Sequence, residues 1–352
     1  METPDLFPKG EAPLPRWLQD EGPAGLIVLG VSAHLHRNLA GFHFFPHAKD
    51  AECATVLAEI REKVDGPEAR WITLADLAKP ARKFLQERQV IGSWVHSDVP
   101  SAAVAMNEDG SQILRVLDQN HLQVVNLQSG FAPEKATAAV MARESDLEQK
   151  LFFAYQEDLG YLTTFVNSVG TGLHLAAMVH LPGLVLAEEI DKIINALQQL
   201  GLRVRGLFGT HQTVRGSLFQ VTSTITLGRD EDEITNDFKY HLGRVIAHEQ
   251  SAREQLHARD KHWLEDLVHR SYAILGAARL ITAQETFDRL SHVRLGVGLG
   301  ILPQHDTVFL NRLLFGQLTG HLQVSCGESL KGSSQARARA SFLRQCLGGS
   351  GD

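Results

Sequence analysis

The stretch Gly160–Leu184, GYLTTFVNSVGTGLHLAAMVHLPGL, is the most informative part of this 352-residue chain. Its glycine-rich segment, residues 170–174, has no Lys followed by Ser or Thr, so it does not form a phosphate-binding P-loop. A second glycine-rich run, GVGLG at residues 296–300, lacks the strand-to-helix context of a dinucleotide site. Both runs therefore predict backbone turns, and neither by itself predicts a nucleotide site.

Length, charge and cysteine content limit the class of protein. A chain of 352 residues favours two domains over one. The formal charge of −7 gives no reason to expect nucleic acid or an anionic membrane as a partner, because both need a basic field. No apolar run is long enough for a membrane span and the start lacks secretory-signal features, so we expect a cytoplasmic protein. Cys53, Cys326 and Cys346 lack metal spacing, which favours free thiols.

The pattern of turn and apolar residues predicts four segments. Residues 1–24 are rich in Pro, Gly and acids, which favours a flexible leader. Residues 25–256 predict a sheet with covering helices, including strands at 26–29, 202–208 and 217–227, helices at 134–157 and 186–200, and a hairpin that turns at Asp109 and Gly110. Helical spacing from about 230 to 290 predicts a helical domain over 257–347. Residues 348–352 form a flexible tail.

Several separated motifs, in a fixed order, carry a resemblance to a known family. They are residues 31–44 (VSAHLHRNLAGFHF), residues 160–163 (GYLT), residues 170–172 (GTG), residues 180–182 (HLP), residues 205–209 (RGLFG), residues 219–228 (FQVTSTITLG) and residues 293–302 (VRLGVGLGIL). From about Gly25 to Leu347 the chain resembles the ATP:guanidino phosphotransferases, or phosphagen kinases, above all the bacterial protein arginine kinases. The resemblance implies an α+β fold, with a phosphagen-kinase-like antiparallel sheet and flanking helices followed by a C-terminal helical domain. It also implies a homodimer.

The family moves a phosphoryl group from MgATP to a guanidinium nitrogen, and this resemblance implies where the triphosphate would lie. Arginines hold the phosphates in the family, because their planar forks make paired, charge-assisted bonds to phosphate oxygens. Only one of the five corresponding positions in this chain is still an arginine. Those positions are occupied by Ser32, His34, Gln123, His174 and Arg205.

The positions that would hold the acceptor guanidinium have changed as well. In the family, two carboxylates hold and deprotonate the acceptor nitrogen, and a Cys thiolate lies beside them. The resemblance aligns the carboxylate loop with residues 117–121, which puts Gln119 at one carboxylate position and Thr210 at the other. Phe165 occupies the Cys position. Residues 107–110 also resemble the loop, but their Asp-Gly pair is better explained as a hairpin turn.

Three of the seventeen histidines would lie near the phosphate positions, namely His34, His36 and His174. Histidine becomes cationic near pH 6.5, so a cleft that they line could bind a small anion in a pH-sensitive way. It could also hold a metal ion. In a third interpretation, these positions simply drifted once arginine was no longer needed.

The C-terminal run QARARA, residues 335–340, aligns with a family motif that forms an allosteric phosphoarginine pocket. Arg339 and Ala340 match that motif, whereas Gln335 and Ala336 stand at its Arg and Asp positions. The arginines of this segment could form a small basic face or a solvated helix surface.

These patterns leave three hypotheses for function. The first is a catalytically degenerate pseudokinase that acts by binding and regulates a protein partner, which would be an active arginine kinase, an adaptor or a Clp-type protease machine. The second is an active ATP-dependent protein arginine kinase with a rearranged site, which would use MgATP. The third is a small-anion or metal sensor that uses the His-lined cleft.

Overall fold

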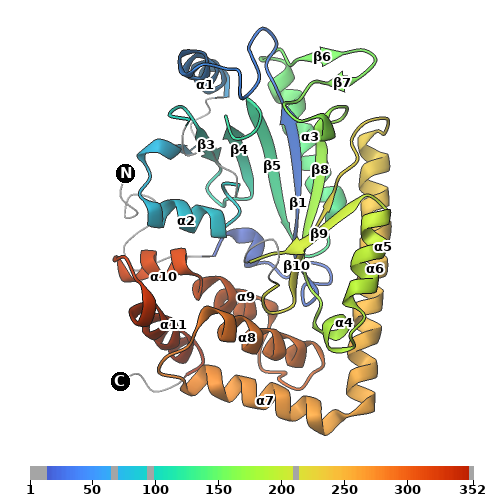
Figure 1. Ribbon diagram of the computed structural model, residues 1–352, viewed down its shortest axis with the longest axis vertical. Helices are drawn as coiled ribbons and strands as arrows, with labels where there is room; N and C mark the ends of the chain where they lie inside the picture. Colours follow the sequence, from blue (N-terminus) through green and yellow to red (C-terminus); the bar gives the residue numbers. More distant parts are fainter. Residues whose placement is uncertain (1–13, 65–69, 93–98, 209–213, 349–352) are drawn as a thin grey trace.

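The computed structural model describes residues 14–64, 70–92, 99–208 and 214–348. A single large antiparallel sheet runs through the molecule, with helices along it and a layer of helices across its lower end (Figure 1). This arrangement confirms the predicted α+β fold with an antiparallel sheet, flanking helices and a helical C-terminal part.

The large sheet has eight strands among the described residues, in the order β2-β3-β4-β5-β1-β8-β10-β9, and each pairing is antiparallel. Every residue of β8 is buried, as is every residue of β1 except His34. In chain order the strands are β1 (Val28–Arg37), β2 (Arg70–Thr73), β3 (Ala103–Met106), β4 (Gln112–Val116), β5 (Leu122–Ser129), β8 (Leu173–His180), β9 (Leu202–Gly206) and β10 (Leu218–Ser223). A separate hairpin is formed by β6 (Tyr155–Gln156) and β7 (Gly160–Tyr161).

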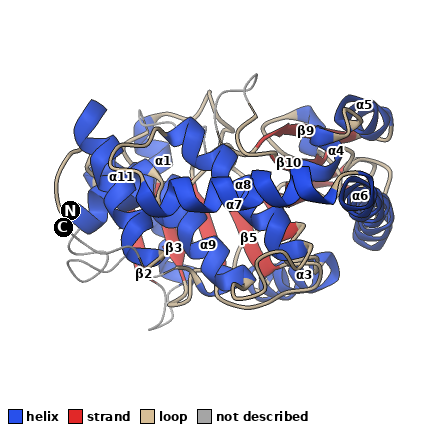
Figure 2. Ribbon diagram, turned by 90° about the horizontal axis from the view of Figure 1, so that it is seen from below, coloured by secondary structure: helices blue, strands red, loops and turns tan. Residues whose placement is uncertain are grey.

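Helices cover the sheet and fill the C-terminal part of the chain. Figure 2 shows the molecule from below, where α7 and α8 lie across the end of the strands. The α-helices are α1 (Asp50–Val64), α2 (Lys79–Glu87), α3 (Pro133–Glu148), α4 (Pro182–Leu186), α5 (Ile190–Gln199), α6 (Glu231–Arg259), α7 (Lys261–Ala277), α8 (Ala283–Gly298), α9 (Thr307–Gly316), α10 (Thr319–Cys326) and α11 (Gly332–Cys346). No helix in the described ranges is both long and apolar enough to cross a membrane.

Local sequence signals explain where α6 begins and ends. Asp230 caps its first turn by accepting a hydrogen bond from the Glu233 backbone N–H, and the Glu233 carboxylate accepts one from the Asp230 N–H. This capping box satisfies N–H groups that have no partner within the helix. At the other end, Asp260 closes α6 and accepts a hydrogen bond from the Trp263 N–H, so the same residue starts α7.

Most of the predicted elements are present, with shifted ends. The predicted hairpin is formed by β3 and β4, and Gly110 at its turn has φ +70°. The helix predicted over 134–157 ends at Glu148, because the chain then forms the β6–β7 hairpin. The helix predicted over 186–200 begins at Ile190, after a separate short helix and a residue, Glu188, with φ +58°.

The flexible leader predicted over residues 1–24 is wrong for residues 14–24. Trp17 and Leu18 are buried, and the Trp17 ring contacts the edge of the Phe315 ring at a centroid distance of 5.9 Å. The Leu18 carbonyl accepts a hydrogen bond of 3.0 Å from Asn311 Nδ2. Composition favoured disorder, but two large apolar side chains anchor this segment against α9. Residues 1–13 of the predicted leader and 349–352 of the predicted tail lie outside the described residues.

Buried polar contacts join the C-terminal helices to the sheet. The Glu87 carboxylate, on α2, accepts hydrogen bonds from the backbone N–H groups of Gly320 at 2.9 Å and His321 at 3.1 Å, at the start of α10. Arg294, on α8, donates to the carbonyls of Gly25 and Leu26 just before β1. These contacts connect the two predicted parts. The predicted division at residue 256 remains a prediction.

A buried ion pair closes the end of β1. Arg37, the last residue of β1, pairs with Glu144 of α3, and its Nη1 donates to the carbonyl of Thr171 at 2.8 Å. Its guanidinium carbon lies 3.4 Å from the centre of the Tyr161 ring. A Cβ atom on Gly172, whose φ is +65°, would lie 2.7 Å from Arg37 Nη1. Only glycine therefore fits beside this guanidinium.

We expect Glu144→Ala to lower the free energy of unfolding by about 3–5 kcal/mol, because it leaves the buried charge of Arg37 without its carboxylate. Asp146→Ala, two residues later on α3, is the matched control. Asp146 is exposed and lies 3.8 Å from Arg143, and such surface pairs contribute about 1 kcal/mol or less. Urea unfolding measures both variants. Equal losses would show that the Arg37 pair is not a special element of the fold.

Candidate functional site

Strand register places the five predicted phosphate positions on one face of the sheet. His34 lies opposite His174, and directly opposed residues of antiparallel strands project to the same face. Ser32 is two residues before His34, so it shares this face. Gln123 lies opposite His36 and therefore joins it. Arg205 lies opposite Gln220 and is set apart from the others by β10.

The face also holds a buried arginine that the sequence analysis did not single out. Arg115, on β4, lies opposite Gln123 and donates from Nη1 to Gln123 Oε1 at 2.7 Å. Its other two nitrogens donate to the carbonyls of Val90 at 2.9 Å and Gln89 at 2.7 Å. An arginine within an otherwise apolar predicted strand was the signal that could have identified it. All three nitrogens of this guanidinium are already engaged by the protein.

The contacts of His36 keep its ring neutral. Arg115 fixes the orientation of Gln123, so the Gln123 amide nitrogen faces His36 Nε2 at 2.9 Å. The Thr164 N–H fixes Asn120 in the same way, so the Asn120 amide nitrogen faces His36 Nδ1 at 3.0 Å. A protonated imidazole would turn an N–H toward both amide nitrogens, whereas a neutral ring turns an N–H toward only one, so these contacts favour the neutral form. Burial and the neighbouring His174 ring lower the pKa of His36 well below its ordinary value.

His174 and His34 are held by neighbouring polar groups. His174 Nδ1 donates to the Ser223 carbonyl at 2.9 Å, and Nε2 accepts from Ser168 Oγ at 2.9 Å. His34 Nε2 lies 2.8 Å from Ser32 Oγ. Burial lowers the pKa of both histidines, and the charge of Arg115 lowers that of His34 further. The ionisation expected near pH 6.5 is therefore moved to lower pH in both rings.

The histidines do not assemble a metal site. Across the parts of the chain that the structure describes, no group of three or more His, Cys, Asp or Glu side chains is placed to hold a metal ion. His174 has both ring nitrogens engaged by protein partners. The metal alternative therefore gains no support from the geometry.

Two of the three acceptor positions lie on neighbouring segments. Gln119 is half-buried in the turn between β4 and β5, and the next residue, Asn120, accepts a hydrogen bond from the Thr164 N–H at 2.8 Å. That bond places the turn beside the segment that carries Phe165, whose side chain is 45% exposed. Thr210 lies outside the described residues. At these two described positions the site presents an amide and an aromatic ring, neither of which can act as a base.

Comparison with known proteins agrees with the motifs. A model of the ATP:guanido phosphotransferase C-terminal catalytic domain matches residues 53–252, and a model of the protein-arginine kinase McsB C-terminal domain matches residues 261–351. The protein-arginine kinase of Symbiobacterium thermophilum is 35% identical over 339 residues, which cover 94% of this chain and 96% of that protein. The chain belongs to the ATP:guanido phosphotransferase family. The protein-arginine kinase of Bacillus subtilis is 33% identical over 341 residues, covering 95% of this chain and 93% of that protein.

Solved structures show that the fold is shared with more distant members of the family. Lombricine kinase superposes with a TM-score of 0.54 at 18% identity, over 69% of this chain and 73% of that one. The duplicated taurocyamine kinase of Schistosoma mansoni, with bound transition state analogue components, gives a TM-score of 0.58 at 18% identity. That match covers 68% of this chain and 35% of the duplicated enzyme. At such identities the likeness shows the fold alone.

The C-terminal motif of this guanido phosphotransferase homologue is largely internal. Arg339 is buried, and it donates to the Gln317 carbonyl at 3.1 Å and to the Ile281 carbonyl at 3.3 Å. Ala340 is buried beside it, whereas Gln335 and Ala336 are half-buried. Arg339 therefore does not contribute to a solvent-facing basic surface.

We expect the free energy of unfolding to fall as the pH is lowered from about 7 to about 5. The pKa of His34 and of His36 is lowered in the folded chain, so the unfolded chain binds more protons below about pH 6.5. The stability that the neutral rings contribute is present above that pH and is lost as the pH falls below it. The loss is at most about 1.4 kcal/mol per pH unit for each ring.

The His34→Gln, His36→Gln double variant should lose stability less steeply over the same range. Urea unfolding at several pH values measures both slopes. Parallel slopes would mean that these rings titrate alike in the folded and unfolded chains, contrary to the burial argument.

Proposed function

We propose that this chain is a protein-arginine-kinase homologue that no longer transfers phosphoryl groups efficiently and that acts by binding, as a pseudokinase. The observation that carries this proposal is a neutral layer of four hydrogen-bonded residues on the sheet face, beside the guanidinium groups of Arg115 and Arg205. At four of five phosphate positions it holds Ser32, His34, Gln123 and His174, and their polar groups bond to one another or to neighbouring protein groups. These residues do not fit a triphosphate, which needs free cationic donors.

Magnitudes support a loss of MgATP binding. A hydrogen bond to a charged group contributes roughly 1.5–3 kcal/mol, so four missing arginines remove on the order of 6–12 kcal/mol, as an upper bound because such contributions do not add. Micromolar affinity corresponds to only about 8 kcal/mol. Arg205 retains its identity, but its Nε already donates to Gln220 Oε1 at 2.8 Å.

The acceptor side supports the same proposal. A guanidinium substrate needs negative charge beside it and a base to take its proton. Gln119 and Thr210 supply neither, and Phe165 replaces a thiolate with a partly exposed ring. We further propose that the chain is a cytoplasmic homodimer and that it acts on a protein, either an active arginine kinase, an adaptor or a Clp-type protease machine. These partner classes rest on family membership.

A second candidate function is an active, ATP-dependent protein arginine kinase with a rearranged site. One observation favours it, because Arg115 adds a guanidinium beside Gln123 on the same face. It would have to exchange its bonds to two carbonyls for bonds to phosphate. Titration calorimetry with MgATP separates the two candidates, since micromolar binding would favour the rearranged kinase. A small-anion sensor is less well supported, because burial holds the site histidines neutral near pH 6.5.

We expect no phosphoarginine when the chain is incubated with MgATP and arginine-rich proteins, because no base stands at position 119 or 210. Labelled ATP and detection of acid-labile phosphate measure the product. The protein-arginine kinase of Bacillus subtilis, assayed in parallel, is the positive control. Turnover well above the no-enzyme background would contradict the proposal.

Restoring the two carboxylates alone should leave the chain inactive. Gln119→Glu with Thr210→Glu gives the acceptor its negative charge, but it leaves four phosphate positions without arginine. We expect weak MgATP binding in this double variant, measured by calorimetry, and no turnover in the phosphoarginine assay. Ready turnover by the double variant would show that the neutral layer does not limit catalysis.

A further inference from the structure

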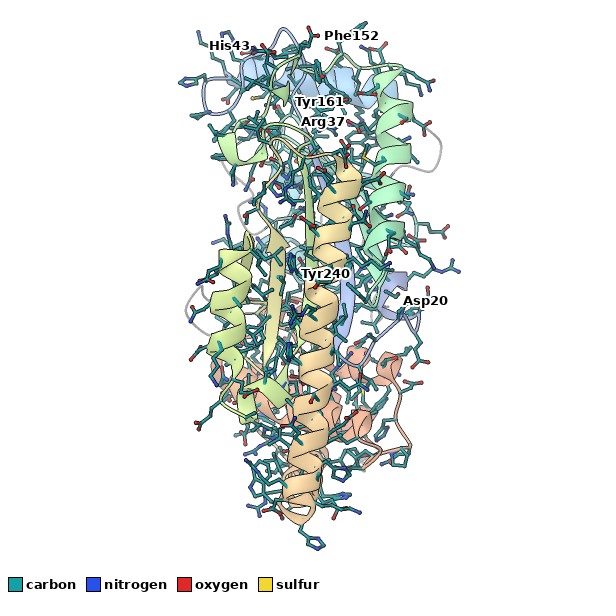
Figure 3. All side chains as sticks on the ribbon, turned by 90° about the vertical axis from the view of Figure 1, so that its right-hand side faces the viewer. Asp20, Arg37, His43, Phe152, Tyr161 and Tyr240 are labelled. Atoms are coloured by element: carbon teal, nitrogen blue, oxygen red, sulfur yellow. The ribbon has the colours of Figure 1, made fainter. Side chains whose placement is uncertain are left out.

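A recess with aromatic walls opens at one end of the molecule, away from the polar face of the sheet. It has a volume of about 380 Å³, which is within the range of ligand pockets, roughly 300–1,000 Å³. Its walls come from the end of α3, the segment after it and the β6–β7 hairpin. The lining residues are Glu148, Leu151, Phe152, Phe153, Tyr155 and Tyr161. Figure 3 shows Phe152 at the top of the molecule, with Tyr161 and Arg37 below it.

The recess exposes large aromatic side chains that contribute little to the core. Phe152 is 80% exposed and Tyr155 is 60% exposed. The rings of Tyr155 and Tyr161 meet edge to face, with centroids 5.3 Å apart, and the Phe153 ring lies 6.4 Å from Tyr161. Aromatic rings held in this way present negative faces to a ligand. A cationic or apolar group therefore suits the recess better than an anion.

A carboxylate in the wall of the recess favours a cationic ligand group over an apolar one. Glu148 Oε1 accepts a hydrogen bond from the Tyr161 hydroxyl, and Oε2 has no hydrogen bond within the described ranges. Exposed acids flank the recess in the chain, at Asp146, Glu157 and Asp158, against two bases, the exposed Lys150 and Arg143, which pairs with Asp146. The local charge is thus negative, and it complements a cationic side chain.

The Tyr161 ring already receives one guanidinium from within the protein. Arg37 stacks on this ring and pairs with Glu144, so a ring and an α3 carboxylate together hold a guanidinium. Glu148 lies one turn after Glu144 on α3, on the same helix face, since residues four apart are neighbours. The recess repeats the same pair of chemical groups, a tyrosine ring and a glutamate, but it is open to solvent.

We propose that this recess binds an arginine side chain of a partner protein. The guanidinium would stack on the aromatic wall and donate to Glu148, without any change in covalent bonds. Arginine suits the site better than lysine, because its planar guanidinium stacks on rings and pairs with a carboxylate at the same time. Neither of the two described acceptor positions, Gln119 and Phe165, lines the recess. The proposal goes beyond the proposed function and holds whether or not the chain transfers phosphoryl groups.

The test uses the full chain and a short Gly/Ser peptide with blocked ends and one central arginine. Titration at low salt is followed by the backbone amide NMR signals of β6 and β7. We expect saturable shifts with the arginine peptide, weaker binding of the lysine peptide, and none with a citrulline peptide, which has a similar shape without the charge. A citrulline peptide that binds as well as the arginine peptide would overturn the proposal.

Paired variants locate the binding. Glu148→Gln should raise the dissociation constant about tenfold or more, because a charged hydrogen bond is lost. Its control, Glu157→Gln, removes an exposed carboxylate that does not line the recess, and should change the constant less than twofold, about the scatter of such a titration. Phe152→Ala should raise the constant about threefold, and its control Val166→Ala, at another exposed apolar residue, should not.

Two other results would refute the assignment. If Gln119→Ala abolished arginine binding while Glu148→Gln did not, arginine would bind at the acceptor position instead. If the peptide caused no shifts and Phe152→Ala changed the sedimentation of the chain, the recess would be a contact between two copies. Neither result bears on the phosphoarginine assay, so this proposal and the proposed function can fail separately.

Discussion

The guanidinium of Arg37 holds several elements together at one end of the large sheet. It joins the end of β1 to the backbone before β8, to Glu144 on α3 and to the Tyr161 ring. A buried charge needs an opposite charge or hydrogen bonds around it, and Arg37 obtains both where these four elements meet. The same requirement excludes any side chain at position 172. The contact therefore ties the β6–β7 hairpin and α3 to the end of β1.

Alternation along β1 separates structural from chemical residues. Arg37 follows His36 directly, so it projects to the opposite face from Ser32, His34 and His36. An arginine that supports the fold is retained, whereas four of the five positions predicted to bind phosphate hold Ser, His or Gln. Several arginines packed together without a ligand would repel one another, but histidine, glutamine and serine can satisfy each other. In the proposed pseudokinase, such residues complete the face without an anion.

The sequence was enough to predict the sheet, the β3–β4 hairpin and the helical C-terminal part, because these depend on periodicity and on turn residues such as Gly110. Composition did not predict the ordered packing of residues 14–24, because it carries no information on the packing of Trp17 and Leu18 against α9. The five predicted phosphate positions rest on the family motifs and stay a prediction. The role of Arg115 did not, because it depends on strand register and on two carbonyls from a distant loop. The histidine pKa shifts depend on burial, which no motif reveals.

The contact between Glu87 and the start of α10 has a consequence for how the two matched family segments behave. If α7–α11 moved away from the rest of the chain, the Glu87 carboxylate would lose its hydrogen bonds from the Gly320 and His321 N–H groups. The carboxylate and the two N–H groups would then be exposed to solvent. The close approach is itself tight, since a Cβ atom on Gly320 would lie 2.5 Å from the Phe84 nitrogen. Asp260 lies between the two matched family segments, and these buried contacts hold the helices that follow it against the rest of the chain. A partner that binds the C-terminal helices would therefore bind a unit that includes the sheet.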